Sequence, residues 1–222
     1  NQVIGKSKTP LVRYYVIENP MDNLVTDALM WKYRDAKVDL AVSNGFRFCP
    51  PLIPNAAKGY AEITNDYLWS MLPVESEVKM GEVTGRQLWD WMEKELHNVF
   101  AKDPAKRFGG WLVRFKGMQL NFTMQQELGK RINWMKVNGK AIAPDDVLTM
   151  LACEREGDPF DTLCRMEQVK NPRKPGHTLH QIMREYLAAH PLVSPVIEGR
   201  AVATDAPATL LSQLEGYDYQ FI

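Results

Sequence analysis

The chain has 222 residues, which is enough for one large domain or two small ones with a buried core. Its 27 lysine and arginine residues equal its 27 aspartate and glutamate residues in number, so it has no excess positive charge for binding nucleic acid or an anionic membrane. No apolar run approaches the roughly 18 residues of a membrane span, and the 3 widely spaced cysteines favour neither a disulfide framework nor a zinc site. We therefore predict a globular chain that binds neither nucleic acid nor a membrane.

A linker and a helix are predicted at the start of the chain. The sequence opens at Asn1 without an initiator methionine, which suggests a piece of a longer protein. We expect residues 1–8 to be the remnant of an interdomain linker and residues 9–222 to form one domain. Asp22 or Asn23 can cap a helix whose apolar residues recur at helical spacing.

A turn follows the apolar strand predicted at residues 38–42. The residues Ser43-Asn44-Gly45 readily accept turn geometry and positive φ, and Arg47 comes shortly after them. A guanidinium in that place can hold a phosphate or another oxyanion through two parallel charge-assisted hydrogen bonds. An ordinary turn with a surface arginine has the same pattern, so the residues alone leave both interpretations open.

The remainder of the chain alternates between predicted helices and strands. Helices are expected from Ile63 to Leu72, capped by Thr64 or Asn65, from Thr84-Gly85 onward and from about Thr178 to Ala189. Strands are expected at residues 77–83, 111–122, 131–137 and 147–153, and Asn138-Gly139 is a strong hairpin signal. This order predicts an α+β fold, with a mixed β-sheet flanked by helices.

The sequence lacks the patterns typical of a catalytic centre. His177 and His180 are three residues apart at a helix start, but no carboxylate at helical spacing accompanies them, so we interpret them as solvated side chains rather than metal ligands. Neither a G-x-S-x-G nucleophile turn nor a glycine-rich phosphate-binding loop occurs. We therefore predict a binding domain without catalytic or metal-binding residues of its own.

Two aromatic residues follow glycine-containing turns. Trp111 comes directly after Gly109-Gly110, and Phe160 comes directly after Gly157-Asp158-Pro159. Their rings could stack on the two faces of a flat ligand, and stacking on one base is worth roughly 1–3 kcal/mol. Both rings could equally fill a core, and their spacing does not separate the two interpretations.

Five short motifs, taken in order, resemble the C-terminal domain of the 5′-nucleotidase family, and the resemblance covers nearly the whole chain. They are Asn23-Leu24-Val25-Thr26-Asp27-Ala28 for the family's N-L-x-x-D-A, Ser43-Asn44-Gly45-Phe46-Arg47 for its glycine-rich turn ending in arginine, Leu72-Pro73-Val74 for L-P-F, Val83-Thr84-Gly85-Arg86-Gln87-Leu88 for L-T-G-x-x-L, and Gly157-Asp158-Pro159-Phe160 for G-D-G-F.

The resemblance implies a two-domain hydrolase, periplasmic or otherwise exported, that releases phosphate from nucleotides. Two divalent metal ions would lie in an N-terminal metallophosphatase domain absent from this chain, which would be inactive alone and would share the nucleotide substrate with that domain. The matching positions imply that Arg47 and Asn44 contact substrate, that Trp111 and Phe160 sandwich the base, and that Asp158 belongs to the same site.

The sequence also departs from that family pattern. The turn has fewer glycines, and Ile17 and Met166 stand where the family carries charged residues. The forms Gly45-Phe46-Arg47-Phe48 and Gly109-Gly110-Trp111-Leu112-Val113-Arg114 resemble the sulfur-oxidation thiosulfohydrolase branch, which acts on a sulfur group attached to a carrier protein. A thiosulfohydrolase-like enzyme and a non-enzymatic interaction module on the same fold are therefore the alternatives.

Overall fold

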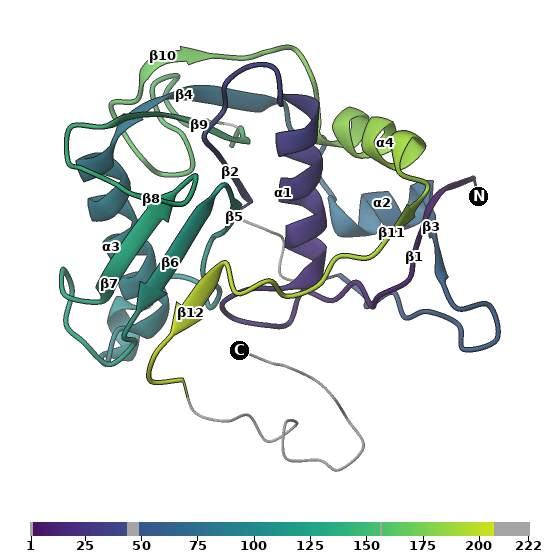
Figure 1. Cartoon of the computed structure of the whole chain (residues 1–222), viewed down its shortest axis with the longest axis horizontal. Coiled ribbons are helices and arrows are strands. Elements are labelled where there is room, and N and C mark those ends of the chain that lie inside the picture. Colours follow the sequence, from purple (N-terminus) through teal and green to yellow (C-terminus); the bar gives the residue numbers. More distant parts are fainter. Residues whose placement is uncertain (1, 44–48, 156, 207–222) are drawn as a thin grey trace.

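A central five-stranded sheet organises the computed structural model, which describes residues 2–43, 49–155 and 157–206 (Figure 1). Strands β2 and β9 run parallel, whereas β5, β4 and β10 are antiparallel to their neighbours, so the predicted mixed sheet is confirmed. In spatial order the strands are β10 (Lys170–Arg173), β4 (Val78–Thr84), β9 (Val147–Cys153), β2 (Leu40–Ser43) and β5 (Arg114–Lys116).

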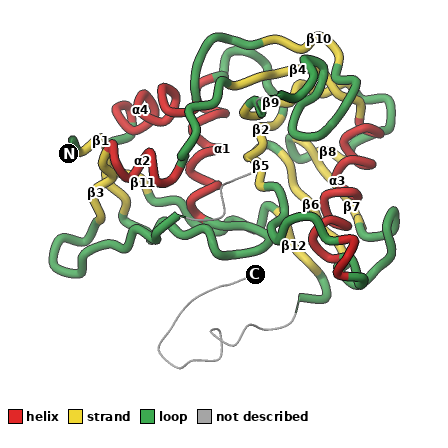
Figure 2. The backbone as a smooth tube through the Cα atoms, turned by 180° about the vertical axis from the view of Figure 1, so that it is seen from behind, coloured by secondary structure: helices red, strands yellow, loops and turns green. Residues whose placement is uncertain are grey.

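Both faces of the central sheet are buried along its middle strands β2 and β9, because side chains on both sides of these strands are apolar. Along β9, Leu151 joins one hydrophobic cluster, whereas Met150 and Ala152 join the other. Helix α3 lies on one side of the sheet, and helices α1, α2 and α4 lie on the other (Figure 2). The helices are α1 (Pro20–Lys32), α2 (Asn65–Met71), α3 (Gly85–Phe100) and α4 (Leu179–Ala189), and a 3₁₀ turn, η1 (Pro104–Lys106), follows α3.

Two smaller sheets are separate from the central one. Asn138 and Gly139 both have positive φ, 51° and 78°, as a two-residue hairpin turn requires, so the predicted hairpin is confirmed. The second sheet has the order β12 (Ala201–Ala203), β6 (Met118–Phe122), β7 (Ile132–Val137) and β8 (Lys140–Ala141), and the third has β11 (Leu192–Val193), β1 (Val3–Ser7) and β3 (Ala61–Thr64). Strand β1 occupies part of the segment expected to be a linker.

Local capping residues determine where the helices begin. The side chain of Asn19 caps α1 by accepting from the backbone N–H of Asp22 at 2.7 Å, so the prediction of Asp22 or Asn23 as the cap was wrong. Pro20 explains the difference, because proline has no backbone N–H and suits the first helical position. Helix α2 begins after Thr64, one of its two predicted caps, and Thr84 and Gln87 form a capping box at α3. Among the described helices, none combines the length and apolar character of a membrane span.

The two histidines near the start of α4 are not both solvated. His180 is fully buried, and its ring centroid lies 4.2 Å from that of Trp69 on α2, so the solvated interpretation was wrong for this residue. His177 is half-buried, and its Nδ1 lies 3.1 Å from the hydroxyl oxygen of Tyr33. The error arose because periodicity does not show that α2 packs over this turn of α4.

The buried His180 is expected to make the domain less stable in mild acid. Burial lowers its pKa below the ordinary value of 6.5, so the unfolded chain binds the proton first. The free energy of unfolding should fall by at most about 1.4 kcal/mol per pH unit as the pH drops from 6.5 towards the lower folded-state pKa. Urea unfolding at several pH values should show a flatter profile for His180→Phe, and an unchanged slope would contradict this origin. The control His190→Gln, at an exposed histidine, should keep the wild-type profile.

Candidate functional site

Three segments of the chain meet at one edge of the central sheet. Because β2 and β9 are parallel, their carboxyl ends lie side by side, and Val42 pairs with Ala152. Strand β5 starts at the same edge, since it is antiparallel to β2 and Arg114 pairs with Ser43. We call this edge, formed by Ser43, Cys153 and Arg114, the β2–β9 edge. Loops at the carboxyl ends of parallel strands commonly carry ligand-binding residues.

Three of the predicted binding residues lie next to the β2–β9 edge. Trp111 is half-buried just before β5, where the N–H of Leu112 donates to the carbonyl of Val16 at 2.8 Å. Asp158 and Phe160 lie in the loop after β9, and Phe160 is 56% exposed. Phe160 therefore does not fill a core, and that alternative interpretation was wrong for this ring.

The other two predicted binding residues, Asn44 and Arg47, lie outside the described residues. Strand β2 ends at Ser43, so the chain reaches the β2–β9 edge directly before them. The topology thus brings Trp111 to the same edge as Asp158 and Phe160, from which it is distant along the chain, at the point where β2 ends. The role of all five residues stays a prediction.

A buried ion cluster lies beneath the β2–β9 edge. Asp22 is fully buried, and its carboxylate oxygens lie 3.2 Å from Nη2 of Arg13 and 3.4 Å from Nη1 of Arg114. Both arginines are also buried, and they donate to the backbone carbonyls of Met71 and Tyr15 at 2.7 and 2.5 Å. Two guanidinium groups and one carboxylate give this cluster a net positive charge.

Asp22 is held in its ionised form. Burial alone would raise the pKa of Asp22, but the charges of Arg13 and Arg114 and hydrogen bonds from Asn19 and Ser43 outweigh that effect and lower the pKa below its ordinary value. Burial lowers the pKa of Arg114 to about 10, although Asp22 opposes the shift. The cluster is therefore charged near neutral pH, and it connects α1 to β2 through Ser43 and to β5 through Arg114.

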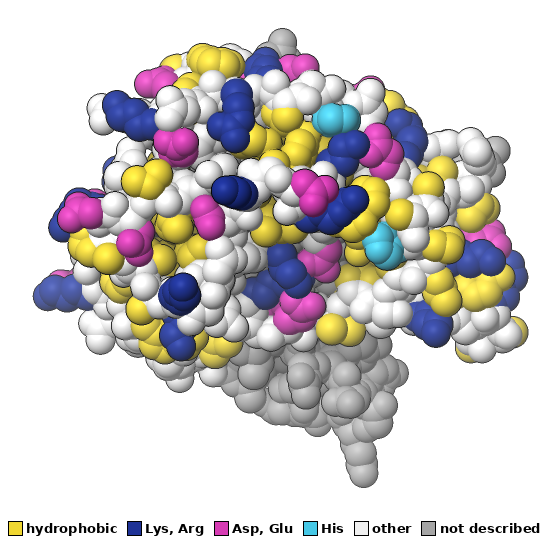
Figure 3. Space-filling view, turned by 45° about the horizontal axis from the view of Figure 1, so that its top comes forward, with side chains coloured by type: hydrophobic (Ala, Val, Ile, Leu, Met, Phe, Trp, Pro, Cys, Tyr) yellow, Lys and Arg dark blue, Asp and Glu magenta, His cyan; other side chains and the backbone are white. Residues whose placement is uncertain are grey.

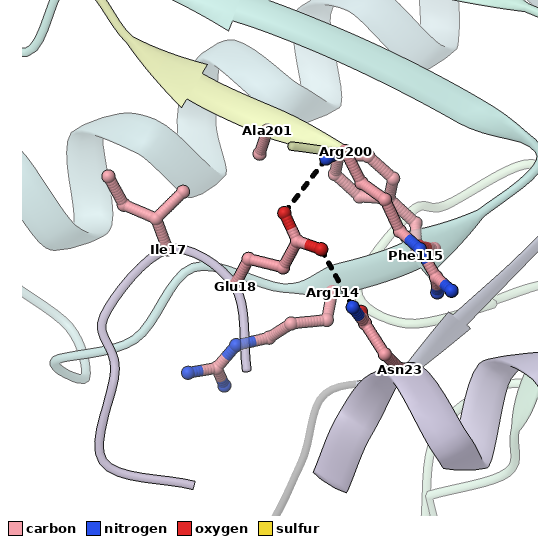
Figure 4. A pocket seen from close by; sticks show the side chains of 7 residues that line it. All are labelled: Ile17, Glu18, Asn23, Arg114, Phe115, Arg200 and Ala201. Carbon is pink, nitrogen blue, oxygen red and sulfur yellow. Dashed lines mark hydrogen bonds between the residues drawn. The ribbon is translucent and has the colours of Figure 1, made fainter. Parts of the chain in front are cut away.

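A small hollow lies beside the cluster, between the start of α1 and the segment before β12. The buried carboxylate of Glu18 accepts hydrogen bonds from Nδ2 of Asn23 at 2.7 Å and from the backbone N–H of Arg200 at 2.8 Å (Figure 4). It also accepts one from the backbone N–H of Glu198 at 2.7 Å. Arg114 also lines the hollow, but its guanidinium points away from Glu18 (Figure 4). This hollow has essentially no room even for a water molecule, so we interpret Glu18 as a structural clamp rather than a ligand-binding group.

Two polar residues of the N-L-x-x-D-A stretch have structural partners. Asn23 donates to Glu18 and to the backbone carbonyl of Val196, and Oδ1 of Asp27 lies 2.6 Å from Nη2 of Arg200. These contacts fasten α1 to the segment that precedes β12. Asn23 and Asp27 of this motif therefore have a structural role, because they hold α1 against the segment before β12.

Sequence reasoning missed Lys79, the second residue of β4. Its ammonium is buried, and it lies 3.2 Å from the carbonyl oxygen of Thr162 and 3.4 Å from a carboxylate oxygen of Glu154. The alternation of side chains along the strand could have predicted that Lys79 is buried, because Lys79 shares a face of β4 with Val83, which belongs to the hydrophobic core. A cation on such a face requires oxygen partners.

The described residues include no group of three or more His, Cys, Asp or Glu side chains that could hold a metal ion. On the face over β10, β4 and α4, basic and acidic side chains are interspersed with hydrophobic ones, and the described residues form no large region of a single charge there (Figure 3). The predicted binding residues that the structure describes, Trp111, Asp158 and Phe160, are thus aromatic and polar side chains.

Comparisons with known sequences identify one family model and two related proteins. Residues 3–151 match the family model described as 5′-nucleotidase, C-terminal domain. The chain is 29% identical over 156 residues to the protein 5NUC of Lutzomyia longipalpis, covering 62% of this chain and 25% of that protein. It is 23% identical over 190 residues to the trifunctional nucleotide phosphoesterase YfkN of Bacillus subtilis, covering 82% of this chain and 12% of that protein.

Solved structures show the same fold. The sulfate thiohydrolase SoxB of Thermus thermophilus has a TM-score of 0.76 at 20% identity, with 95% of this chain and 36% of that chain covered. A 5′-nucleotidase precursor from the same species has a TM-score of 0.71 at 19% identity, with 93% of this chain and 40% of that chain covered. This chain thus spans well under half of the relatives that it matches. It belongs to the 5′-nucleotidase C-terminal domain family.

Proposed function

We propose that this chain is the substrate-binding domain of a two-domain hydrolase that releases phosphate from nucleotides. The observation that carries the proposal is the exposed ring of Phe160 at the β2–β9 edge, where Trp111 also lies. An exposed aromatic side chain beside polar groups is suited to stacking on a nucleoside base. The family relationship supports the same interpretation.

In this proposal the reaction itself belongs to an upstream metallophosphatase domain. Its two metal ions would supply an activated water and neutralise the charge of the phosphate. The residues of this chain would hold the nucleoside, with Trp111 and Phe160 on its faces and Asp158 within reach of its polar edge. Arg47 and Asn44 would contact the substrate from the turn after β2.

Replacing Phe160 with alanine in the whole protein is expected to raise the KM for AMP about 5- to 150-fold, which corresponds to one lost stacking contact. The value of kcat should change less, because the ring does not touch the reacting phosphorus. Phosphate release measured over a range of AMP concentrations tests this. The matched control is Trp134→Ala, which removes an aromatic side chain, 42% exposed, from β7 in the second sheet. Equal KM values for both variants and the wild type would refute base stacking at Phe160.

A second candidate function is hydrolysis of a sulfur group attached to a carrier protein. The observation in its favour is the form of the segment Gly109-Gly110-Trp111-Leu112-Val113-Arg114, whose last residue belongs to the buried ion cluster. Sulfate release from a carrier-bound thiosulfonate, without phosphate release from any nucleotide, would favour this candidate. Turnover of neither substrate by the metal-loaded whole protein would favour a non-enzymatic interaction module.

A further inference from the structure

The buried ammonium of Lys79 holds the loop that presents Phe160. Lysine is rarely buried, because removing its charge from water is costly unless oxygen atoms replace the water. Only 2% of the Lys79 side chain is exposed, while its strand neighbours Val78 and Met80 pack in the core on the opposite side of the sheet. This cation therefore needs a specific set of partners.

Among the described residues, the oxygen partners of the Lys79 ammonium come from the loop after β9. Its Nζ lies 3.2 Å from the carbonyl oxygen of Thr162, 3.4 Å from that of Pro159 and 3.4 Å from Oε1 of Glu154. An ammonium group has three donors, so these three oxygens match its hydrogen-bonding capacity. The centroid of the Phe160 ring lies 5.3 Å from the same nitrogen, which is within the range of a cation–π contact.

The loop segment at residues 159–162 is a turn that closes around the ammonium. The N–H of Thr162 donates to the carbonyl of Pro159 at 2.9 Å, and Lys79 contacts the carbonyls at both ends of this turn. Phe160 lies inside the turn, with more than half of its surface in solvent. Its ring therefore takes its position from the turn and the ammonium, not from a hydrophobic core.

A second lysine keeps the counter-ion of Lys79 ionised. Burial would raise the pKa of Glu154, but contacts with Lys174 and Lys79 outweigh that effect and lower it. Lys174 also lies 3.1 Å from the carboxylate of Glu77, directly before β4. These four charges balance, so the arrangement persists at neutral pH and joins β4, β10 and the loop.

We propose that Lys79 is a positioning residue that fixes Phe160 at the β2–β9 edge and sets the kind of ligand that stacks on it. The ammonium contacts the inner face of the ring, so it offsets the negative charge that an aromatic face normally carries. The outer face then suits an electron-rich heterocycle, such as a nucleotide base, better than a cationic ligand. This inference rests on the proposed function for its ligand, but the positioning itself is measurable without one.

The first test measures the loop alone. Chymotrypsin cleaves after exposed aromatic residues, and mass spectrometry distinguishes cleavage after Phe160 from cleavage after Phe108, which is 63% exposed and lies outside this loop. Lys79→Met should increase cleavage after Phe160 about ten- to a hundredfold, as expected for loss of charged hydrogen bonds that close a local segment. Cleavage after Phe108 should not change, and Lys79→Arg, which keeps the charge, should restore most of the protection.

The second test measures ligand selection in the whole protein. Lys79→Met should raise the KM for AMP about as much as Phe160→Ala does, and the double variant should be little worse than either, because both changes remove the same contact. Unchanged cleavage after Phe160 in Lys79→Met would overturn the proposal, as would equal increases at Phe108 and Phe160, which indicate general unfolding. A raised KM in Phe160→Ala with an unchanged KM in Lys79→Met would also overturn it and leave the proposed function standing. Selective loop opening with no KM effect of Phe160→Ala would support the positioning role and reject the proposed function.

Discussion

Replacing Asp22 with asparagine is expected to lower the free energy of unfolding by about 3–5 kcal/mol. The substitution keeps the size of the side chain but removes the only carboxylate that Arg13 and Arg114 are seen to contact among the described residues. Both guanidinium groups would then remain buried without a counter-charge, which is among the costliest single changes in a protein interior. Urea unfolding at neutral pH, followed by tryptophan fluorescence, measures the loss.

The matched control for this substitution is Asp35→Asn. The side chain of Asp35 is 93% exposed, and its contact with Arg34 is 3.9 Å long, so the control should change stability by no more than about 0.5 kcal/mol. If Asp22→Asn were as mild as the control, the ion cluster would not stabilise the fold.

The contribution of Asp22 also has a defined pH range. Its folded-state pKa is lowered, so its stabilisation is fully present above the ordinary value of 3.8 and is lost as the pH falls from there through the folded-state pKa. The difference in stability between wild type and Asp22→Asn should therefore narrow in strong acid. A difference that stayed constant would mean that the variant loses packing rather than charge.

Replacing Gly117 with alanine is expected to cost about 2–6 kcal/mol, the sum of backbone strain and overpacking. Gly117 joins β5 to β6 with φ at +88°, and a Cβ there would lie 2.1 Å from the carbonyl oxygen of Asp39 and 3.0 Å from Cα of Leu40. Neither backbone atom can move without shifting the start of β2. The same urea titration measures this effect.

Substitutions at two other glycines distinguish backbone strain from overpacking as causes of the stability loss in Gly117→Ala. Gly59 has φ at +72° but open space around it, so Gly59→Ala should cost only the strain of about 1–2 kcal/mol. Gly110 has neither a left-handed φ nor a close neighbour, and Gly110→Ala should stay within about 0.5 kcal/mol. If Gly117→Ala lost no more stability than Gly59→Ala, the backbone at Asp39 and Leu40 would be able to move away from the added methyl group at little cost.

Much of the secondary structure was predictable because it depends on local signals. Apolar spacing and a capping threonine indicated α2, and Asn138-Gly139 indicated the hairpin between β7 and β8. The cap of α1 was assigned wrongly because Asn19 and Pro20 act together, a combination that the helix period alone does not reveal. Local patterns therefore predicted which segments form helices and strands more reliably than they predicted the residue at which each one begins.

The site was predictable only through its motifs. The parallel pairing of β2 with β9 brings together segments more than a hundred residues apart, and no periodic pattern encodes that pairing. The burial of His180 under Trp69 and the contacts of Lys79 with the loop after β9 are likewise tertiary. A polar residue on a core-facing position of a strand or helix is the one sequence feature that could have indicated them.

The order of strands along the chain bears on how the domain is made on the ribosome. Strand β1 receives its parallel neighbour β11, and β6 receives its parallel neighbour β12, only when the last strands have been synthesised. Until then, each of the early strands has an open edge, and the partners of Glu18 at residues 198 and 200 do not yet exist. These two sheets are therefore complete only after residues 192–203 have been synthesised, and until then the open strand edges are available for pairing with another chain.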